Sequence, residues 1–134
     1  MEIVLKNQPC EKQKAAQALE QFGRDHQLPA AAVHAADLAL EEHLTNLMTH
    51  GFADDLEHQI TVRFSVASDF VIEVEDDGRP FNPLTQPEVD TSVPLSLKPV
   101  GGLGIHLMRR FMDGLDYRRE GARNILRMTK RLEG

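Results

Sequence analysis

The sequence predicts an α+β domain, a two-layer sandwich in which helices cover one face of a mixed, mostly antiparallel sheet. Two stretches within the first 51 residues carry apolar residues at helical spacing. Two later pairs of segments alternate apolar and polar residues, which is typical of half-buried strands in hairpins. The predicted order is β-α-α-β-β-loop-α-β-β. A length of 134 residues suits one domain that spans residues 1–134.

The first part of the chain is expected to hold one strand and two helices. The stretch "MEIVLKNQ" predicts a short strand that ends at Pro9. Residues 11–26 have a helical apolar period and form the first predicted helix. Pro29 suits the first turn of a second helix, and Gly51 is well placed to end it. The main apolar stripe of this second helix consists of Val33, Ala36, Leu40, Leu44 and Leu47.

The second part of the chain is expected to add two hairpins and a third helix. Alternating residues predict strands over 60–66 and 70–75, joined by the turn "ASD". A helix is expected over 103–112, followed by a closing hairpin that turns at "EGAR". Residues 82–100 contain four of the seven prolines and lack a clear period. Long loops of this kind tend to be lids or binding segments.

Composition narrows the classes of function. The net charge of −6 argues against a general nucleic-acid binder, which is normally basic. No apolar run approaches the roughly 20 residues of a membrane span, and "MEIVLK" lacks the features of a secretory signal. We therefore expect a cytoplasmic protein with no membrane partner.

Metal sites built on cysteine or histidine are not expected. Cys10 is the only cysteine, which excludes an internal disulfide and a cysteine-based zinc cage. The histidines at 34, 43 and 50 do not form the HExxH zinc pattern. They are predicted to be surface or packing residues.

A first motif, "EEHLTNLMTHGF", places two oxygen-bearing side chains one turn apart on the second predicted helix. Glu42 and Asn46 are four residues apart and lie opposite the leucine stripe, next to small and apolar residues. A carboxylate and an amide oxygen can hold Mg²⁺ and supply a general base. An exposed pair with no role has the same spacing, so the motif alone leaves both interpretations open.

A second motif, "VEDDGRPFNP", follows the second strand of the first predicted hairpin. Asp-Gly is a common turn signal, and a plain turn is one interpretation. However, Asp76 ends an apolar strand, where a partly buried carboxylate needs a hydrogen-bond donor. The exocyclic amine of adenine is such a donor, whereas guanine presents a carbonyl at that position. An aspartate in this place would therefore select adenine.

A third motif, "PVGGLGIHLM", places Gly101, Gly102 and Gly104 at the start of a predicted helix. Glycines let the backbone approach a ligand closely, and a helix N-terminus attracts anions such as phosphate. A tight structural loop is the alternative. A Walker loop is excluded because Gly-Lys-Ser and Gly-Lys-Thr are absent, and the pattern of a Rossmann fingerprint is incomplete.

Together, the three motifs resemble the N, G1 and G2 boxes of the gyrase and histidine-kinase-like (GHKL) ATPase superfamily. The matching blocks are E-x-x-x-N ending in HGF, then D-x-G-x-x-F, then GGLGI, in this order and spacing. Within the superfamily, the chain most resembles the small anti-sigma-factor serine/threonine kinases, over residues 11–131. The resemblance implies a Bergerat ATP-binding fold with an ATP lid over residues 82–100.

The resemblance also implies roles for residues of the first two boxes. Asn46 would coordinate an Mg²⁺ ion that bridges the ATP phosphates, and Glu42 would be the catalytic general base. Asp76 would accept a hydrogen bond from the adenine amine, and Gly78 would give the base room.

In the third box, the resemblance implies that Gly102, Leu103 and Gly104 line the phosphates with the N–H groups of the helix start. The chain also departs from the family pattern. Arg79-Pro80 follows the D-x-G box where many relatives have a second glycine, and Asn124 stands where the family often has a threonine near the adenine. Lys98 is the only basic residue of the predicted lid.

The function that the resemblance implies is an ATP-dependent protein serine/threonine kinase that uses ATP/ADP and Mg²⁺. It would phosphorylate an anti-sigma-factor antagonist protein and sequester a sigma factor, or an analogous regulator, by partner switching. Relatives of this type often form homodimers through the sheet. The alternative is a non-catalytic nucleotide-sensing module that changes protein partners, and a purely structural interaction domain is a third reading.

Overall fold

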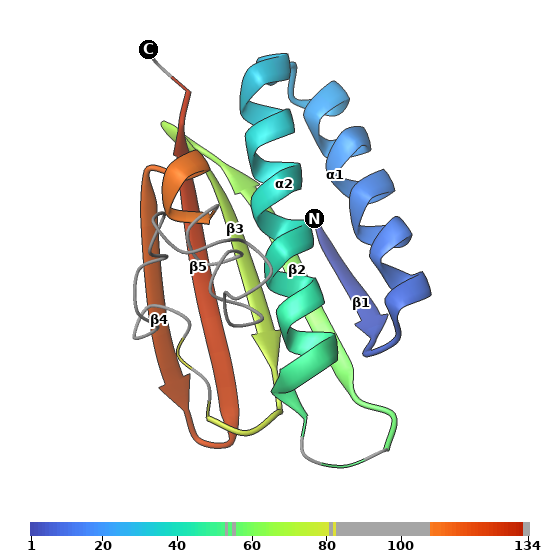
Figure 1. Ribbon diagram of the computed structural model, residues 1–134. Helices are drawn as coiled ribbons and strands as arrows, with labels where there is room; N and C mark the ends of the chain where they lie inside the picture. Colours follow the sequence, from blue (N-terminus) through green and yellow to red (C-terminus); the bar gives the residue numbers. More distant parts are fainter. Residues whose placement is uncertain (53, 55, 81, 83–107, 133–134) are drawn as a thin grey trace, which may run out of the picture.

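The computed structural model describes residues 1–52, 54, 56–80, 82 and 108–132. Five strands and two long helices are present in this part of the chain (Figure 1). The strands are β1 (Glu2–Lys6), β2 (Gln59–Val66), β3 (Asp69–Asp76), β4 (Gly114–Glu120) and β5 (Arg123–Arg131). The helices are α1 (Lys12–Asp25) and α2 (Ala30–Asn46), with a 3₁₀ turn at Pro9–Glu11 (η1) and a π-helical turn at Leu47–Gly51 (η2).

The strands form one sheet in the order β1-β2-β3-β5-β4. Every neighbouring pair of these described strands is antiparallel. Both α1 and α2 lie on the same face of the sheet (Figure 1). The predicted α+β sandwich is therefore confirmed. The last strand, β5, lies between β3 and β4, and strands from both ends of the sequence belong to the same sheet.

The predicted strands and the first predicted helix agree with the structure, whereas the second predicted helix is α-helical only to Asn46 and continues to Gly51 as the π-helical turn η2. Pro29 directly precedes α2 and its carbonyl oxygen accepts the first helical hydrogen bonds. Residues 108–111 are helical, which fits the end of the helix expected over 103–112. Most of the predicted lid, residues 83–100, and residues 101–107 lie outside the described residues. No helix among the described residues is long and apolar enough to cross a membrane.

The core lies between the two helices and the inner face of the sheet. Three phenylalanines from α1, β2 and β3 pack against one another, with Phe22 at ring-centroid distances of 5.6 Å from both Phe64 and Phe70. The predicted stripe of α2 is buried here, since Leu40 and Leu44 are almost fully inaccessible. Sequence alternation thus sets which face of each strand meets the helices.

The second side of α2 is also covered. Ala35 and Ala39 lie away from the leucine stripe, yet both are buried. This burial fits the small and apolar residues that the sequence places next to Glu42 and Asn46. Asn46 lies on the same side at the end of α2 and is only 5% exposed.

We expect Phe70→Ala to lower the free energy of unfolding by about 3–5 kcal/mol, because it removes a fully buried ring and leaves a cavity. Ser65→Ala is the matched control, since Ser65 is exposed on the adjacent strand, and its effect should stay within about 0.5 kcal/mol. Urea unfolding followed by circular dichroism measures both. Equal effects of the two substitutions would contradict the assignment of the core.

Candidate functional site

The carboxylate of Asp76 is buried at the end of β3. The residue is 2% exposed and pairs with Ile60 of β2 and Asn124 of β5. Its Oδ2 atom accepts hydrogen bonds from the backbone N–H of Gly78 at 2.9 Å and from Nδ2 of Asn124 at 3.0 Å. Burial raises the pKa of Asp76, and these two hydrogen bonds act in the opposite direction. Oδ1 has no hydrogen-bond partner among the described residues, so one carboxylate oxygen is fixed and the other is unused.

Asn124 fastens the turn after β3 to the last hairpin. Besides Asp76, its Nδ2 reaches the carbonyl oxygen of Arg79 at 2.9 Å. Its Oδ1 accepts hydrogen bonds from Nη1 of Arg119, at 2.9 Å, and from the hydroxyl of Tyr117. Arg119 also donates to the carbonyl oxygen of Gly78 at 3.2 Å. The residue that stands in place of the family's threonine therefore lies directly beside Asp76 and holds its orientation.

The same turn contacts the end of the helical layer. The N–H of Arg79 donates to the carbonyl oxygen of Gly51 at 3.1 Å. A Cβ atom on Gly78 would lie only 2.3 Å from that carbonyl oxygen, which is too close for any side chain. Gly78 is thus required for the close approach of two backbone segments. This contact brings the first two sequence motifs together, although Gly51 and Gly78 are 27 positions apart in the sequence.

Asn46 and Glu42 occupy the last turns of α2. The Nδ2 atom of Asn46 is buried and has no hydrogen-bond partner among the described residues. An unpaired buried amide costs about 1–3 kcal/mol, so such a group is expected to serve a ligand. Glu42, one turn earlier, is half-buried. The unpaired atom is the NH₂ donor of the amide, which suits an anionic acceptor such as phosphate. Mg²⁺ would instead take the amide oxygen of Asn46 or the carboxylate of Glu42, together with phosphates and water.

Two histidines near Asn46 also have unpaired ring nitrogens, and the three residues form a row of unpaired nitrogens. His43 Nδ1 and His50 Nε2 are also buried without partners among the described residues. Positions 43, 46 and 50 lie on one side of a helix. His43 is 2% exposed, and burial lowers its pKa to about 4, so it is neutral near pH 7. His34 is exposed and His43 is buried, in agreement with the predicted surface and packing roles.

Two features of this region are not indicated by the sequence. The row of unpaired nitrogens depends on burial, which the sequence motif did not reveal. The turn that follows Asn46 is π-helical over Leu47–Gly51, and π-helical turns are frequent at functional sites. No residue pattern in "LMTHG" indicated this geometry. By contrast, Gly102, Leu103, Gly104 and Lys98 lie outside the described residues, so the third motif remains a prediction.

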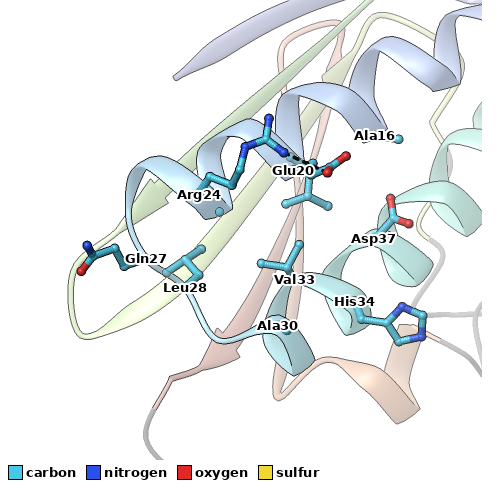
Figure 2. Close-up of a pocket in the computed structure, with 11 residues that line it drawn as sticks. Ala16, Glu20, Arg24, Gln27, Leu28, Ala30, Val33, His34 and Asp37 are labelled. Carbon is cyan, nitrogen blue, oxygen red and sulfur yellow. Dashed lines mark hydrogen bonds and ion pairs between the residues drawn. The ribbon is translucent and has the colours of Figure 1, made fainter.

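A groove of about 510 Å³ lies elsewhere, between α1 and α2 near the loop that joins them (Figure 2). Leu19, Leu28 and Val33 form part of its apolar lining, and Glu20 and Asp37 are among its polar residues. Its lining includes neither Asn46 nor Asp76. The groove is therefore separate from the candidate site.

Comparison with known proteins identifies a family. The model of the histidine kinase-like ATPase domain matches residues 6–130. Among curated proteins, no sequence matches this chain.

Solved structures with similar folds include two from bacteria. The structure of the RsbU and RsbW domains of Rv1364c from Mycobacterium tuberculosis has a TM-score of 0.67 and 13% identity, over 98% of this chain and 31% of that chain. The histidine kinase domain of the blue-light activated histidine kinase from Erythrobacter litoralis EL346 has a TM-score of 0.56 and 20% identity, over 92% of this chain and 60% of that chain. At these identities the likeness concerns the fold, and the chain spans less than two thirds of either neighbour.

Gly78→Ala should destabilise the protein by about 1–3 kcal/mol, because the added methyl group would meet the carbonyl oxygen of Gly51. Gly114→Ala is the control, since a Cβ atom there lies at an ordinary 3.4 Å from Thr129. Urea midpoints of the two variants and the wild type measure the difference. A Gly78 variant as stable as the Gly114 variant would show that the two backbone segments do not touch.

His43 should make the protein sensitive to acid. The unfolded chain takes up a proton at this residue below pH 6.5, whereas the folded chain resists protonation until about pH 4. Stability should therefore fall as the pH is lowered through this range, by about 3 kcal/mol in total from this group. His43→Leu should remove this component, and His34→Leu, at an exposed position, should keep it. Urea unfolding between pH 4 and 7 provides the measurement, and equal pH slopes for both variants would refute a buried neutral His43.

Proposed function

Because this chain belongs to the histidine kinase-like ATPase domain family, we propose that it binds ATP or ADP with Mg²⁺ and acts as an anti-sigma-type protein serine/threonine kinase. The observation that carries the proposal is the contact between Gly51 and the turn at Gly78. This contact joins the segment that follows Asn46 to the turn that follows Asp76. An unpaired amide and a carboxylate with an unused oxygen thereby belong to one connected region.

Asp76 recognises the base. Its Oδ2 atom is occupied by Gly78 and Asn124, and Oδ1 is left to accept a hydrogen bond from the exocyclic amine of adenine. Guanine would direct a carbonyl oxygen at the carboxylate and leave both acceptors unpaired in a buried place. Sites built around a buried hydrogen bond reject the wrong partner strongly for this reason. The preference for adenine over guanine thus depends on the carboxylate being ionised and fixed.

The phosphates bind at the other end, next to α2. Asn46 would provide the protein ligand of Mg²⁺, and the backbone N–H groups expected around Gly102, Leu103 and Gly104 would contact the phosphate oxygens. When bound, Mg²⁺ neutralises charge on the phosphates and on the group in transfer. The burial of Asn46 next to the turn that carries Asp76 supports this assignment, and the NH₂ group of the same amide, unpaired among the described residues, is left to donate to a phosphate oxygen.

Glu42 acts as the general base of the transfer. Its carboxylate accepts the proton of a serine or threonine hydroxyl of the partner protein while that oxygen forms a bond to the γ-phosphorus. The bond between the γ-phosphorus and the β–γ bridging oxygen breaks, and ADP leaves. Glu42 then returns its proton to solvent. The half-exposed position of Glu42 supports this role, since a partner hydroxyl must reach it.

The partners follow from the family resemblance. The phosphate acceptor is an anti-sigma-factor antagonist, and the second partner is a sigma factor or an analogous regulator. A homodimer through the sheet also belongs to this proposal. Neither nucleic acid nor a membrane is among the proposed partners.

Glu42→Gln should abolish phosphate transfer from labelled ATP to the antagonist encoded nearby and leave ATP binding nearly unchanged. The neighbouring variant Glu41→Gln is the control, because Glu41 is exposed and lies outside the E-x-x-x-N block that begins at Glu42. Binding is followed by thermal shift, where a ligand at 100 times its Kd adds about 2.7 kcal/mol.

Three outcomes separate the functions. Transfer by the wild type and its loss in the Glu42 variant support the kinase. Nucleotide binding without any transfer by the wild type indicates a nucleotide-sensing module that switches partners. An absence of thermal shift with ATP or ADP plus Mg²⁺ would remove the nucleotide function altogether.

A further inference from the structure

The imidazole of His58 lies between two carboxylates that come from different parts of the chain. His58 directly precedes β2, and its Nε2 atom is 2.7 Å from Oδ1 of Asp54. Its Nδ1 atom is 3.0 Å from Oδ1 of Asp77, in the turn after β3. We call Asp54, His58 and Asp77 the His58 clamp. It connects the segment that follows η2 with the turn that follows Asp76.

Proton counting fixes the charge of the ring. An ionised carboxylate only accepts hydrogen bonds, and a neutral imidazole carries one N–H group. Two carboxylates can both be satisfied only if both ring nitrogens donate, which requires the imidazolium form. The pKa shifts agree with the geometry, because the hydrogen bond to Asp54, followed by that to Asp77, raises the pKa of His58.

The surroundings hold the ring in place. It stacks on Phe52 with a centroid distance of 4.5 Å, an arrangement that favours a cation. The backbone of His58 is fixed by Asn7, which accepts from its N–H at 2.9 Å and donates to its carbonyl oxygen at 3.0 Å. The side chain of His58 is only 17% exposed. Asp54 and Asp77 are the charged groups that face it among the described residues, since Phe52 and Asn7 are uncharged.

The clamp acts next to the proposed base-binding group. Asp77 lies between Asp76 and Gly78 in the sequence, so its side chain and the backbone of the turn move together. Asn124 and Arg119 hold the carbonyl groups of this turn from the side of β4 and β5. His58 holds it from the side of η2.

We propose that protonated His58 is a positioning residue for nucleotide binding, which fixes the turn at Asp76 through Asp77 and makes nucleotide affinity fall when the pH rises. This inference rests on the proposed nucleotide function. When His58 loses its proton, only one of its two hydrogen bonds can persist. The bond to Asp54 is the shorter one, so the remaining N–H stays with Asp54 and Asp77 is released.

The direction of the effect follows from the raised pKa. Below the ordinary value of 6.5 the ring is charged and the clamp is closed. As the pH rises through the higher value of the folded protein, the clamp opens and its contribution is lost. Nucleotide binding should therefore weaken as the pH rises through this value.

The test compares the ADP affinities of the wild type and His58→Gln from pH 6 to 9 by calorimetry. Glutamine has no titrating group, so the ratio of the two Kd values removes the titration of ADP itself. At pH 6 the wild type should bind about two- to tenfold more tightly, which is the effect of one hydrogen bond. At pH 9 the ratio should approach one. A ratio that stays constant over the whole range would mean that His58 is only structural.

Asp77→Asn provides a rescue that a merely structural role would not produce. Its amide oxygen can accept from the imidazolium at low pH, and its NH₂ group can donate to the neutral ring at high pH. This variant should therefore lose the pH dependence that is specific to the wild type and bind ADP well at pH 9. It also serves as the second variant if His58→Gln does not fold, and a wild-type pH profile in Asp77→Asn would overturn the proposal.

The failure of this inference differs from the failure of the proposed function. If the wild type binds neither ADP nor ATP at any pH, the nucleotide function and the role of His58 both fall. If the wild type binds nucleotide but the affinity ratios do not change with pH, only the role of His58 falls. Asp76→Asn, which removes the charge of the proposed base acceptor, should weaken ADP binding at every pH and shows that the assay detects the site.

Discussion

The contact between the carbonyl oxygen of Gly51 and the turn at Gly78 is the constraint on which the arrangement of the site depends. It is a backbone contact, and a Cβ atom at Gly78 would come within 2.3 Å of the oxygen. Here the end of η2, in the helical layer, meets the turn that follows β3. Because the two segments meet without side chains between them, the end of η2 and the end of β3 cannot move independently. The carboxylate of Asp76 is buried beside this contact, where its Oδ2 atom accepts the hydrogen bond from Gly78.

The pattern of the sequence predicted the layers better than the pairing of the strands. Alternation identified β2 and β3, and helical spacing identified α1 and α2, because these signals are local. The position of β5 between β3 and β4 is set by long-range pairing, which local periodicity does not predict. The family resemblance helped at one such place, since Asn124 does lie beside Asp76. The sequence does not indicate the His58 clamp, because Asp54 and Asp77 lie on either side of His58 in the sequence and both contact it only in the folded chain.

The histidines at 43 and 58 have opposite environments and therefore opposite effects on stability. His43 is surrounded by the core with no partner for Nδ1, and burial keeps it neutral. His58 lies at the surface between two carboxylates, which keep it charged. Stability from the first declines when the pH falls below 6.5, and stability from the second declines when the pH rises through its raised pKa. The two together favour a maximum of stability near neutral pH.

The unpaired polar atoms of the described residues are not scattered. The buried nitrogens without partners in this part of the chain, on His43, Asn46 and His50, lie along α2 and η2, and the end of η2 is bonded to the turn that follows Asp76. Each such atom costs stability, at about 1–3 kcal/mol for a buried group without a partner. Elsewhere in the same region, buried polar groups such as Asn124 use both ends of the amide. The amide of Asn46, directly before the π-helical turn η2, by contrast leaves its NH₂ group unpaired among the described residues. The free-energy cost of unpaired buried nitrogens is therefore concentrated in this region. Ligand binding recovers such a cost, and this is the physical reason to place the function between α2 and the end of β3 rather than in the groove between α1 and α2.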